Sequence, residues 1–214
     1  MKLHLGCGQI YLPGYLNIDY PLDKHSVQTE SVADKLIDIK KLRYKANSID
    51  EVRLHHVYEH FDRATAVALL SIWISWLKMG GVVRIEVPDF ARTSASVFSP
   101  FTSKAVKSTG MRHIFGSQEA EWAVHYYGWS PSSLKEIFEL LGLEVVSLHK
   151  SSWKGTYNIE ITGKKIETIT KQSALKLCTN WLSQFLVDET KGEKTLLRYW
   201  VDISKKQIKA GWAK

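Results

Sequence analysis

Short apolar runs alternate with longer amphipathic segments through most of the chain, and this alternation leaves few folds open. The strand-like runs are 2–5, 15–19, 35–39 (the weakest), 50–57 and 82–87. After Asp62, a predicted N-cap, apolar residues recur at helical spacing as far as Lys78, and Gly80-Gly81 would end that helix. Alternating strands and helices predict an α/β fold with a mostly parallel sheet.

The second half of this region predicts a long insertion and a closing hairpin. Residues 91–129 are rich in Ser, Thr and aromatic side chains without a clear period, which predicts an insertion with short helices. Ser130-Pro131 starts the next helix and Gly142 ends it. Strands at 143–149 and 156–164 are close enough in sequence to pair antiparallel. We therefore expect one domain over residues 1–165.

A basic tail follows at residues 166–214. It contains amphipathic segments at 171–187 and about 194–209, which predict two helices packed on the domain or extending from it. Charges balance over residues 1–149, so residues 150–214 carry the whole net charge of +7. The tail is expected to be a solvated basic surface, with contact to an anionic surface as the alternative. The chain could be a monomer or a homodimer.

Other features narrow the class of protein. No zinc finger, KH loop or RNP-type strand occurs, so specific nucleic-acid binding is not expected. Two cysteines cannot make a disulfide framework, and only five residues precede Gly6, too few for a signal peptide. The most apolar stretch, 64–77, is shorter than the roughly 20 residues of a membrane span. These features predict a cytoplasmic protein.

A glycine pair, Gly6-Cys7-Gly8, follows the first strand, and Asp19 ends the second. Glycines there let the backbone turn sharply beside a ligand, and the acid can accept hydrogen bonds from a ribose diol. The third glycine of a dinucleotide fingerprint is absent, and Asp19 follows too soon for the usual spacing of about 20 residues. The pattern favours a nucleoside cofactor without a pyrophosphate; the alternative is a simple tight turn.

Four segments in this order carry a family resemblance: "LHLGCG...GYLNID", "LIDIKKLRYKANSIDEVRLHHVYEHF", "MGGVVRIEVPDF" and "WSPSSLKEIFELLGLEVV". Together they resemble the class I S-adenosylmethionine-dependent methyltransferases, and most closely the small group with a shortened first helix. The resemblance covers about residues 2–164. It implies a Rossmann-like sheet, an S-adenosylmethionine cofactor and an enzyme that transfers a methyl group.

The resemblance implies a cofactor site made of Gly6, Cys7, Gly8, Asp19, Asp38, Ile39, His55 and His56. The glycine loop would pass under the methionine part of the cofactor, and Asp19 would hold the ribose hydroxyls. Asp38 and Ile39 would flank the adenine, and the two histidines would line the floor beneath the sulfonium. His4 departs from the pattern, because many relatives carry an acid there that supports the methionine amino group.

Methyl transfer depends mainly on holding the acceptor in line with the methyl group. A hydroxyl acceptor also benefits from a general base, a role that histidine suits at neutral pH. The candidate catalytic residues are His60, His125 and Asp89; the alternative for each is a structural polar role. We expect a small-molecule or sugar acceptor, methylated at oxygen. The alternative is a non-catalytic cofactor-binding module of the same fold.

The run His56-x-x-Glu59-His60 also has the spacing of inverted zinc peptidases. On one helix the two histidines would share a face and could hold zinc. His56, however, belongs to a predicted strand ahead of the helix cap, and no third ligand follows at a fixed spacing. No metal site is therefore expected.

Overall fold

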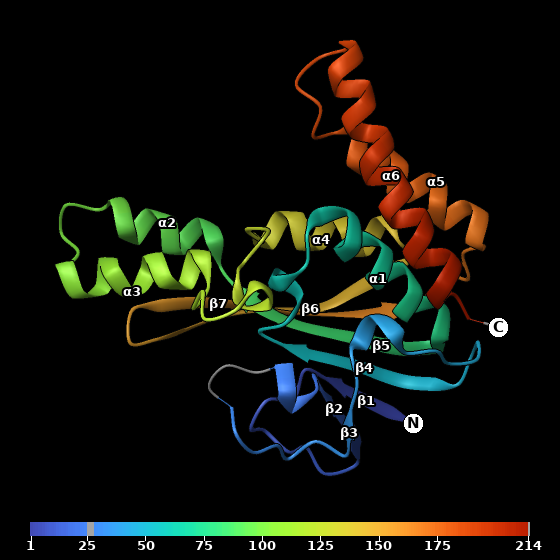
Figure 1. Ribbon diagram of the computed structural model, residues 1–214, viewed down its shortest axis with the longest axis horizontal. Coiled ribbons are helices and arrows are strands. Elements are labelled where there is room, and N and C mark those ends of the chain that lie inside the picture. Colours follow the sequence, from blue (N-terminus) through green and yellow to red (C-terminus); the bar gives the residue numbers. More distant parts are fainter. Residues whose placement is uncertain (25–27, 214) are drawn as a thin grey trace.

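The computed structural model describes residues 1–24 and 28–213, which form a seven-stranded sheet in the order β3-β2-β1-β4-β5-β7-β6 (Figure 1). The strands are β1 (Lys2–Leu5), β2 (Tyr15–Asp19), β3 (Lys35–Leu36), β4 (Ile49–His55), β5 (Leu77–Pro88), β6 (Leu143–Trp153) and β7 (Thr156–Lys165). Neighbouring strands run parallel, except that β7 runs antiparallel to both β5 and β6. The predicted α/β class, with a mostly parallel sheet and an antiparallel last strand, is confirmed.

The first two strands have the predicted bounds, whereas the third is shorter than predicted. β3 covers only Lys35–Leu36, because Asp38 then caps a short 3-10 helix, η2 (Ile39–Lys41). The Asp38 carboxylate accepts a hydrogen bond from the backbone N–H of Lys40 at 2.9 Å. Asp38 and Ile39 therefore stand just beyond the strand, at the edge where the neighbouring parallel strands also end.

Six α-helices and several short 3-10 helices surround the sheet in the described part of the chain. The α-helices are α1 (Arg63–Trp76), α2 (Phe90–Phe98), α3 (Lys104–Phe115), α4 (Pro131–Leu140), α5 (Lys171–Ser183) and α6 (Lys191–Gly211). The other 3-10 helices are η1 (Leu22–Lys24), η3 (Tyr58–His60) and η4 (Glu121–Ala123). The predicted caps of α1 and α4 are confirmed, since Asp62 accepts from the N–H of Thr65 and Ser130 forms a capping box.

The predicted end of α1 is wrong. The helix stops at Trp76 rather than at Gly80-Gly81, and β5 already begins at Leu77. The buried Nζ of Lys165, at the end of β7, donates to the carbonyls of Ile74 at 2.9 Å and Leu77 at 2.8 Å. Carbonyls at a helix end lack partners within the helix, and here the N–H of Leu77 and the Lys165 side chain supply the cap that Gly80-Gly81 was expected to supply.

The tail packs against α1. Ser204 on α6 donates its hydroxyl to the carbonyl of Ala64 at 2.8 Å, and the indole of Trp76 donates to the carbonyl of Gly211 at 3.1 Å. Cys178 and Trp181 of α5 are buried in the common core. α1 is consequently covered by the sheet on one side and by the tail helices on the other (Figure 1). No helix of the described chain combines the length and apolarity that a bilayer crossing requires.

A stack of aromatic rings anchors the segment after β4. Tyr58 stacks on Trp129 with ring centroids 4.8 Å apart, and Trp129 in turn lies 6.3 Å from Trp181 in a nearly parallel orientation. All three rings are almost fully buried. This stack ties η3, the end of the insertion and α5 together, so the residues that follow Tyr58 have a fixed position.

Candidate functional site

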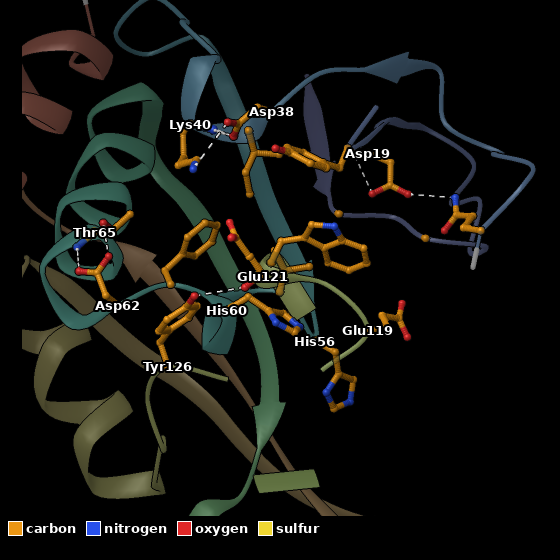
Figure 2. A pocket seen from close by; sticks show the side chains of 18 of the residues that line it. Asp19, Asp38, Lys40, His56, His60, Asp62, Thr65, Glu119, Glu121 and Tyr126 are labelled. Atoms are coloured by element: carbon orange, nitrogen blue, oxygen red, sulfur yellow. Dashed lines mark hydrogen bonds and ion pairs between the residues drawn. The ribbon is translucent and has the colours of Figure 1, made fainter. Parts of the chain in front are cut away.

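A cavity of about 590 Å³ opens at the carboxyl ends of β1, β2 and β4 (Figure 2). Its volume is typical of a small-molecule site. The lining residues are Gly6, Gly8, Asp19, Tyr20, Gln28, Asp38, Ile39, Lys40, His56, Val57, His60, Phe61, Asp62, Thr65, Glu119, Glu121, Trp122, Tyr126 and Gln207. In an open parallel sheet, ligands bind at this edge. Six of the eight predicted cofactor residues and one of the three predicted catalytic residues lie in this lining.

The glycine loop forms one wall. Gly6 and Gly8 have φ values of +69° and +53°, in the region that favours glycine. The N–H groups of Gly6 and Cys7 both donate to the carbonyl of Ile18, at 2.8 and 3.0 Å. A Cβ on Gly6 would lie 2.3 Å from a methyl carbon of Val57, so only glycine lets the loop pass so close to the segment after β4.

Acidic side chains stand at the ends of β2 and β3. Asp19 is 5% exposed; one carboxylate oxygen accepts from the N–H of Tyr20 at 2.8 Å, and the other accepts from the Gln28 amide at 3.5 Å. Asp38 faces the same cavity beside Ile39. Two carboxylates and an apolar side chain in one cavity suit a ligand that has a flat ring at one end and hydroxyl groups nearby.

Two predicted cofactor residues, and the residue noted as a departure, lie outside the lining. Cys7 is buried, and burial raises the pKa of its thiol to about 11. His55 pairs instead with Glu86, with Nε2 and carboxylate oxygen 3.3 Å apart. His4 is also buried and hydrogen-bonds Asn17 at 3.1 Å, so it supports the loop from behind.

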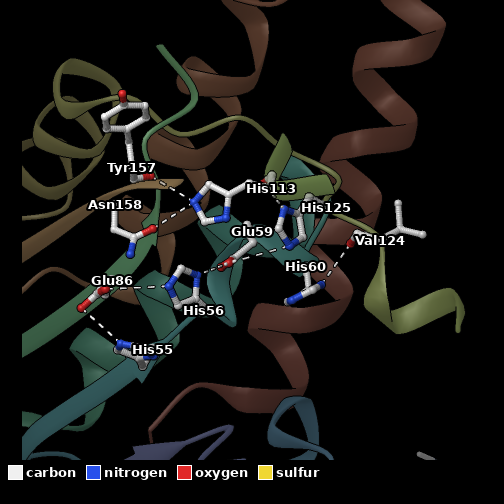
Figure 3. A network of polar contacts seen from close by, with 10 residues as sticks. All are labelled: His55, His56, Glu59, His60, Glu86, His113, Val124, His125, Tyr157 and Asn158. Carbon is white, nitrogen blue, oxygen red and sulfur yellow. Dashed lines mark hydrogen bonds and ion pairs between the residues drawn. The ribbon is translucent and has the colours of Figure 1, made fainter. Parts of the chain in front are cut away.

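His56 joins two carboxylates (Figure 3). Its Nδ1 lies 3.2 Å from Glu59 and its Nε2 lies 3.7 Å from Glu86. Burial opposes charge on the ring, but the hydrogen bond with Glu59 and the two negative charges outweigh it and raise the pKa of His56. The chain leaves β4 here, since His56 has a φ of +54°, a conformation that non-glycine residues seldom adopt.

Glu59 is 1% exposed and lies among His56, His60 and His125, which we call the histidine cluster. Burial would raise the pKa of its carboxyl, but the hydrogen bond from His56 and the charges of His56, His60 and His125 lower it overall. One of its oxygens has no hydrogen-bond partner among the described residues. Its backbone carbonyl accepts from the N–H of Tyr126 at 2.9 Å, so the cluster also fixes the segment that covers the cavity.

The rings of His60 and His125 pack edge to face, with centroids 4.7 Å apart. Each Nδ1 lies near a backbone carbonyl, that of Val124 at 3.1 Å for His60 and that of His113 at 3.0 Å for His125. A carbonyl only accepts, so each Nδ1 carries a proton, and in the neutral form of each ring the lone pair is on Nε2. Burial lowers the pKa of His125. His60 lines the cavity, whereas His125 lies behind it.

Asp89 occupies a different position. It is fully buried, and its carboxylate accepts from the N–H of Arg92 as the N-cap of α2. It does not line the cavity. Its other oxygen has no hydrogen-bond partner among the described residues.

Two groups of potential metal ligands occur in the described chain, each with its ligand atoms within 4.8 Å of one another. The groups are His55, His56 and Glu86, and Glu59, His60 and His125. The two histidines of the His56-x-x-Glu59-His60 run therefore fall into different groups. Direct contacts between imidazoles and carboxylates, at 3.3 Å for His55–Glu86 and 3.9 Å for His125–Glu59, account for the proximity of these residues.

Several residues that line the cavity were not predicted as site residues. Gln207 reaches the cavity from α6, in the tail, so no local pattern could connect it to the glycine loop. Asp62 and Thr65 stand in the first turn of α1, where the capping pattern explains them without reference to a site. Lys40 lies two residues after Asp38 and pairs with it at 3.7 Å. The proximity of Lys40 to a predicted site residue was the one available signal.

Comparisons with solved structures give similar folds at low sequence identity. One match lies in the complex between the Haloferax volcanii Trm112 methyltransferase activator and a methyltransferase: 14% identity, TM-score 0.53, covering 79% of this chain and 83% of that one. A second match is the Burkholderia thailandensis 1,6-didemethyltoxoflavin-N1-methyltransferase with bound 1,6-didemethyltoxoflavin and S-adenosylhomocysteine. Its sequence identity is 12% and its TM-score 0.52, and the match covers 78% of this chain and 71% of that one. A third match is an S-adenosylmethionine-dependent methyltransferase from Listeria monocytogenes, with 13% sequence identity and a TM-score of 0.51, covering 78% of this chain and 91% of that one. No protein-family model and no curated protein matches the sequence.

Proposed function

We propose that this chain, whose fold is that of the class I S-adenosylmethionine-dependent methyltransferases, transfers a methyl group from S-adenosylmethionine to a small acceptor, a sugar or a related polyhydroxylated molecule, at oxygen. The main support for this proposal is that the glycine loop, Asp19 and the imidazole of His60 line one and the same cavity. The part of the cavity beside the glycine loop and Asp19 would hold the cofactor, and the part beside His60 would hold the acceptor. Both lie at the edge of the sheet where this fold binds ligands.

The acceptor groups and the apolar side chain beside the glycine loop fit S-adenosylmethionine. Among the described residues, Asp19 accepts one short hydrogen bond, from the N–H of Tyr20, and a longer one from Gln28, which leaves lone pairs for two ribose hydroxyls. Asp38 and Ile39 offer an acceptor and an apolar face to the adenine. At Gly8 a Cβ would meet nothing within 4 Å, so the backbone there is open to a ligand. The fit supports a nucleoside cofactor without a pyrophosphate.

The part beside His60 suits a ring that carries hydroxyl groups. Tyr126, Glu119 and Glu121 line the cavity (Figure 2), and so does Trp122. Aromatic faces pack against sugar rings, and carboxylates accept hydrogen bonds from hydroxyls. The segment 116–126 that carries these residues is held to the rest of the protein by the backbone hydrogen bond between Tyr126 and Glu59.

The chemistry required of the protein is modest. Bound S-adenosylmethionine supplies a methyl group on a good leaving group, so orientation of the acceptor is the main contribution of the chain. His60 lines the cavity with its Nδ1 held by Val124, and in the neutral ring its Nε2 would take the acceptor's hydroxyl proton. Buried Glu59, close to both His60 and His125, would stabilise the positive charge that forms.

Calorimetric titration with S-adenosylhomocysteine tests the cofactor part of the cavity. We expect micromolar binding to the wild type, weakened roughly ten- to a hundredfold in Asp19→Ala, because lost hydrogen bonds to a charged group cost about 1.5–3 kcal/mol. Asp202→Ala, an exposed position on α6, is the matched control and should bind as wild type does. Absence of binding to the folded wild type would contradict the proposal.

Turnover distinguishes an enzyme from the alternative, a non-catalytic module that only binds the cofactor. The assay supplies S-adenosylmethionine with a panel of hydroxylated acceptors and measures formation of S-adenosylhomocysteine. Acceptor-dependent formation supports the enzyme. Tight cofactor binding without turnover over a broad panel favours the binding module. The two free buried cysteines, Cys7 and Cys178, are compatible with the reducing cytoplasm as its place of action.

A further inference from the structure

An arm projects from the sheet on the side away from the tail (Figure 1). It consists of residues 90–118, which form α2, its connecting loop and α3, and of residues 145–159, the outer part of the β6–β7 hairpin. Packing joins the two segments: Gly155 at the hairpin turn lies so close to Val106 that a Cβ would meet it at 2.8 Å. We call these two segments the basic arm.

The basic arm contains no Asp or Glu. Its Lys and Arg residues are Arg92, Lys104, Lys107, Arg112, Lys150 and Lys154. No acidic side chain in the described part of the protein forms a salt bridge with any of them. Since the chain carries a net charge of +7, these six residues concentrate a local excess nearly as large as that of the whole protein.

Among the described residues, the most exposed Phe, Tyr and Trp rings lie at the outer end of the same arm. Phe101 is 97% exposed and Phe98 is 82% exposed, both at the connection between α2 and α3. Trp153 is 67% exposed at the end of β6, beside the hairpin turn. The connection around the phenylalanines, 98–103, contains no charged residue. Large apolar side chains on protruding loops cost solvation free energy unless a partner covers them.

We propose that the basic arm docks the protein on an anionic phospholipid bilayer, with Phe98, Phe101 and Trp153 entering the headgroup region. Aromatic residues favour the membrane interface, and lysines around them are attracted by anionic lipids. Lys104 and Lys107 open α3 directly behind the phenylalanine loop, and Lys154 adjoins Trp153. The apolar side chains and the positive charges therefore occupy the same end of the arm.

A nucleic acid is the less suitable occupant. Proteins that bind single strands set their aromatic rings along a positively charged groove, where successive bases stack. Here the rings stand at the tips of a loop and a hairpin, from which they can insert into the headgroup region of a bilayer. The tail is also less suitable than the arm, because its exposed apolar residues Val187, Leu196 and Tyr199 lie close in sequence to Asp188, Glu189 and Glu193.

Vesicle co-sedimentation with the full chain tests the proposal. We expect binding to phosphatidylcholine vesicles that contain phosphatidylglycerol, weak binding to phosphatidylcholine alone, and a decline with rising salt. Lys104→Gln/Lys107→Gln should weaken binding about thirtyfold, since each lysine near an anionic surface contributes a roughly five- to sixfold gain. Phe98→Ser/Phe101→Ser/Trp153→Ser should reduce binding at high salt, where the apolar contribution remains.

Matched variants in the tail separate the arm from general charge and apolarity. Lys205→Gln/Lys206→Gln removes two lysines of α6, and Leu196→Ser/Tyr199→Ser removes exposed apolar side chains there. Both should bind vesicles as the wild type does. S-adenosylhomocysteine titration serves as the folding control for the arm variants, because none of the cavity-lining residues belongs to the arm. Failure of the methyltransferase proposal would leave this test intact, with thermal unfolding as its folding control.

Three results would overturn the proposal. The first is absence of binding to anionic vesicles. The second is equal loss of binding in the arm and tail variants, which would indicate unspecific charge attraction. The third is tighter binding to single-stranded oligonucleotides than to vesicles, lost in the same arm variants, which would identify a nucleic-acid surface instead.

Discussion

The Nδ1 atom of His56 lies 3.2 Å from the carboxylate of Glu59, which is 1% exposed. The two residues shift each other's pKa in opposite directions, upward for the imidazole and downward for the carboxyl. They form an ion pair beneath the cavity, on the short segment that follows β4. The stability of this segment should therefore depend on pH.

The first prediction concerns this dependence. A raised histidine pKa stabilises the fold fully below the ordinary value of about 6.5, and the contribution is lost as the pH rises through the raised value. A lowered glutamate pKa contributes above about 4.5, and the contribution is lost as the pH falls through the lowered value. The pair should thus stabilise most between about pH 4.5 and 6.5. We expect Glu59→Gln to lower the free energy of unfolding more at pH 6 than at pH 8.5.

Urea unfolding at the two pH values measures this difference. Glu139→Gln, at an exposed position on α4, is the control and should show no such difference. Equal losses in Glu59→Gln at both pH values would mean that the imidazole does not carry charge beside Glu59.

The second prediction separates two constraints at the glycine loop. Gly8→Ala should cost only the left-handed backbone conformation, about 1–2 kcal/mol, because a Cβ there meets nothing within 4 Å. Gly6→Ala has the same conformational cost and also collides with Val57, which adds about 1–3 kcal/mol. The Tm of Gly6→Ala, measured by thermal unfolding, should therefore be well below that of Gly8→Ala. If the two variants unfold alike, the close approach to Val57 is not a constraint on the loop.

The third prediction concerns His60. Asparagine places a donor near the position of Nδ1, so His60→Asn can keep the hydrogen bond to Val124 while it removes Nε2. With a hydroxyl acceptor in hand, kcat should fall about 10²- to 10⁴-fold, the usual contribution of a general base, with cofactor affinity unchanged. Comparison of kcat with S-adenosylhomocysteine affinity makes the test. A variant that loses affinity and keeps kcat would place His60 in cofactor binding instead.

The fourth prediction concerns the cap of α1. Lys165→Met removes the buried amino group that donates to the carbonyls of Ile74 and Leu77, of which Ile74 keeps the N–H of Leu77, and should destabilise the protein by about 1–3 kcal/mol. Lys164→Met, its exposed neighbour in β7, should change stability by less than about 0.5 kcal/mol. Chemical unfolding of the pair measures the difference. Equal stability of the two variants would show that the Lys165 amino group is dispensable as a cap.

Local signals predicted the elements that local chemistry determines. β1 and β2 were predicted to the residue, because each apolar run ends at a glycine or an acid that interrupts it. α4 was predicted through its capping serine and its terminal glycine, which has a φ of +79°. The glycine loop, Asp19, Asp38 and His60 share a cavity because parallel strands carry their carboxyl ends to one edge.

The features that the sequence analysis missed depend on contacts between distant segments. The end of α1 depends on Lys165, which is 91 residues from Ile74. The basic arm joins two segments that lie in different parts of the chain, so a count of charge along the sequence assigned the positive excess to the tail. Gln207 reaches the cavity only through the packing of α6 on α1. No periodicity or motif reports such contacts.

The order of the last strands has a consequence for biosynthesis. β7 lies between β5 and β6, although β6 precedes it in the chain. During translation, the backbone groups of β5 and β6 that pair with β7 therefore stay unpaired until the ribosome has released β7. The same strand delivers Lys165 to the end of α1. A nascent chain stalled ahead of β7 would combine two unpaired edges with an uncapped helix, and it would depend on chaperones to avoid aggregation.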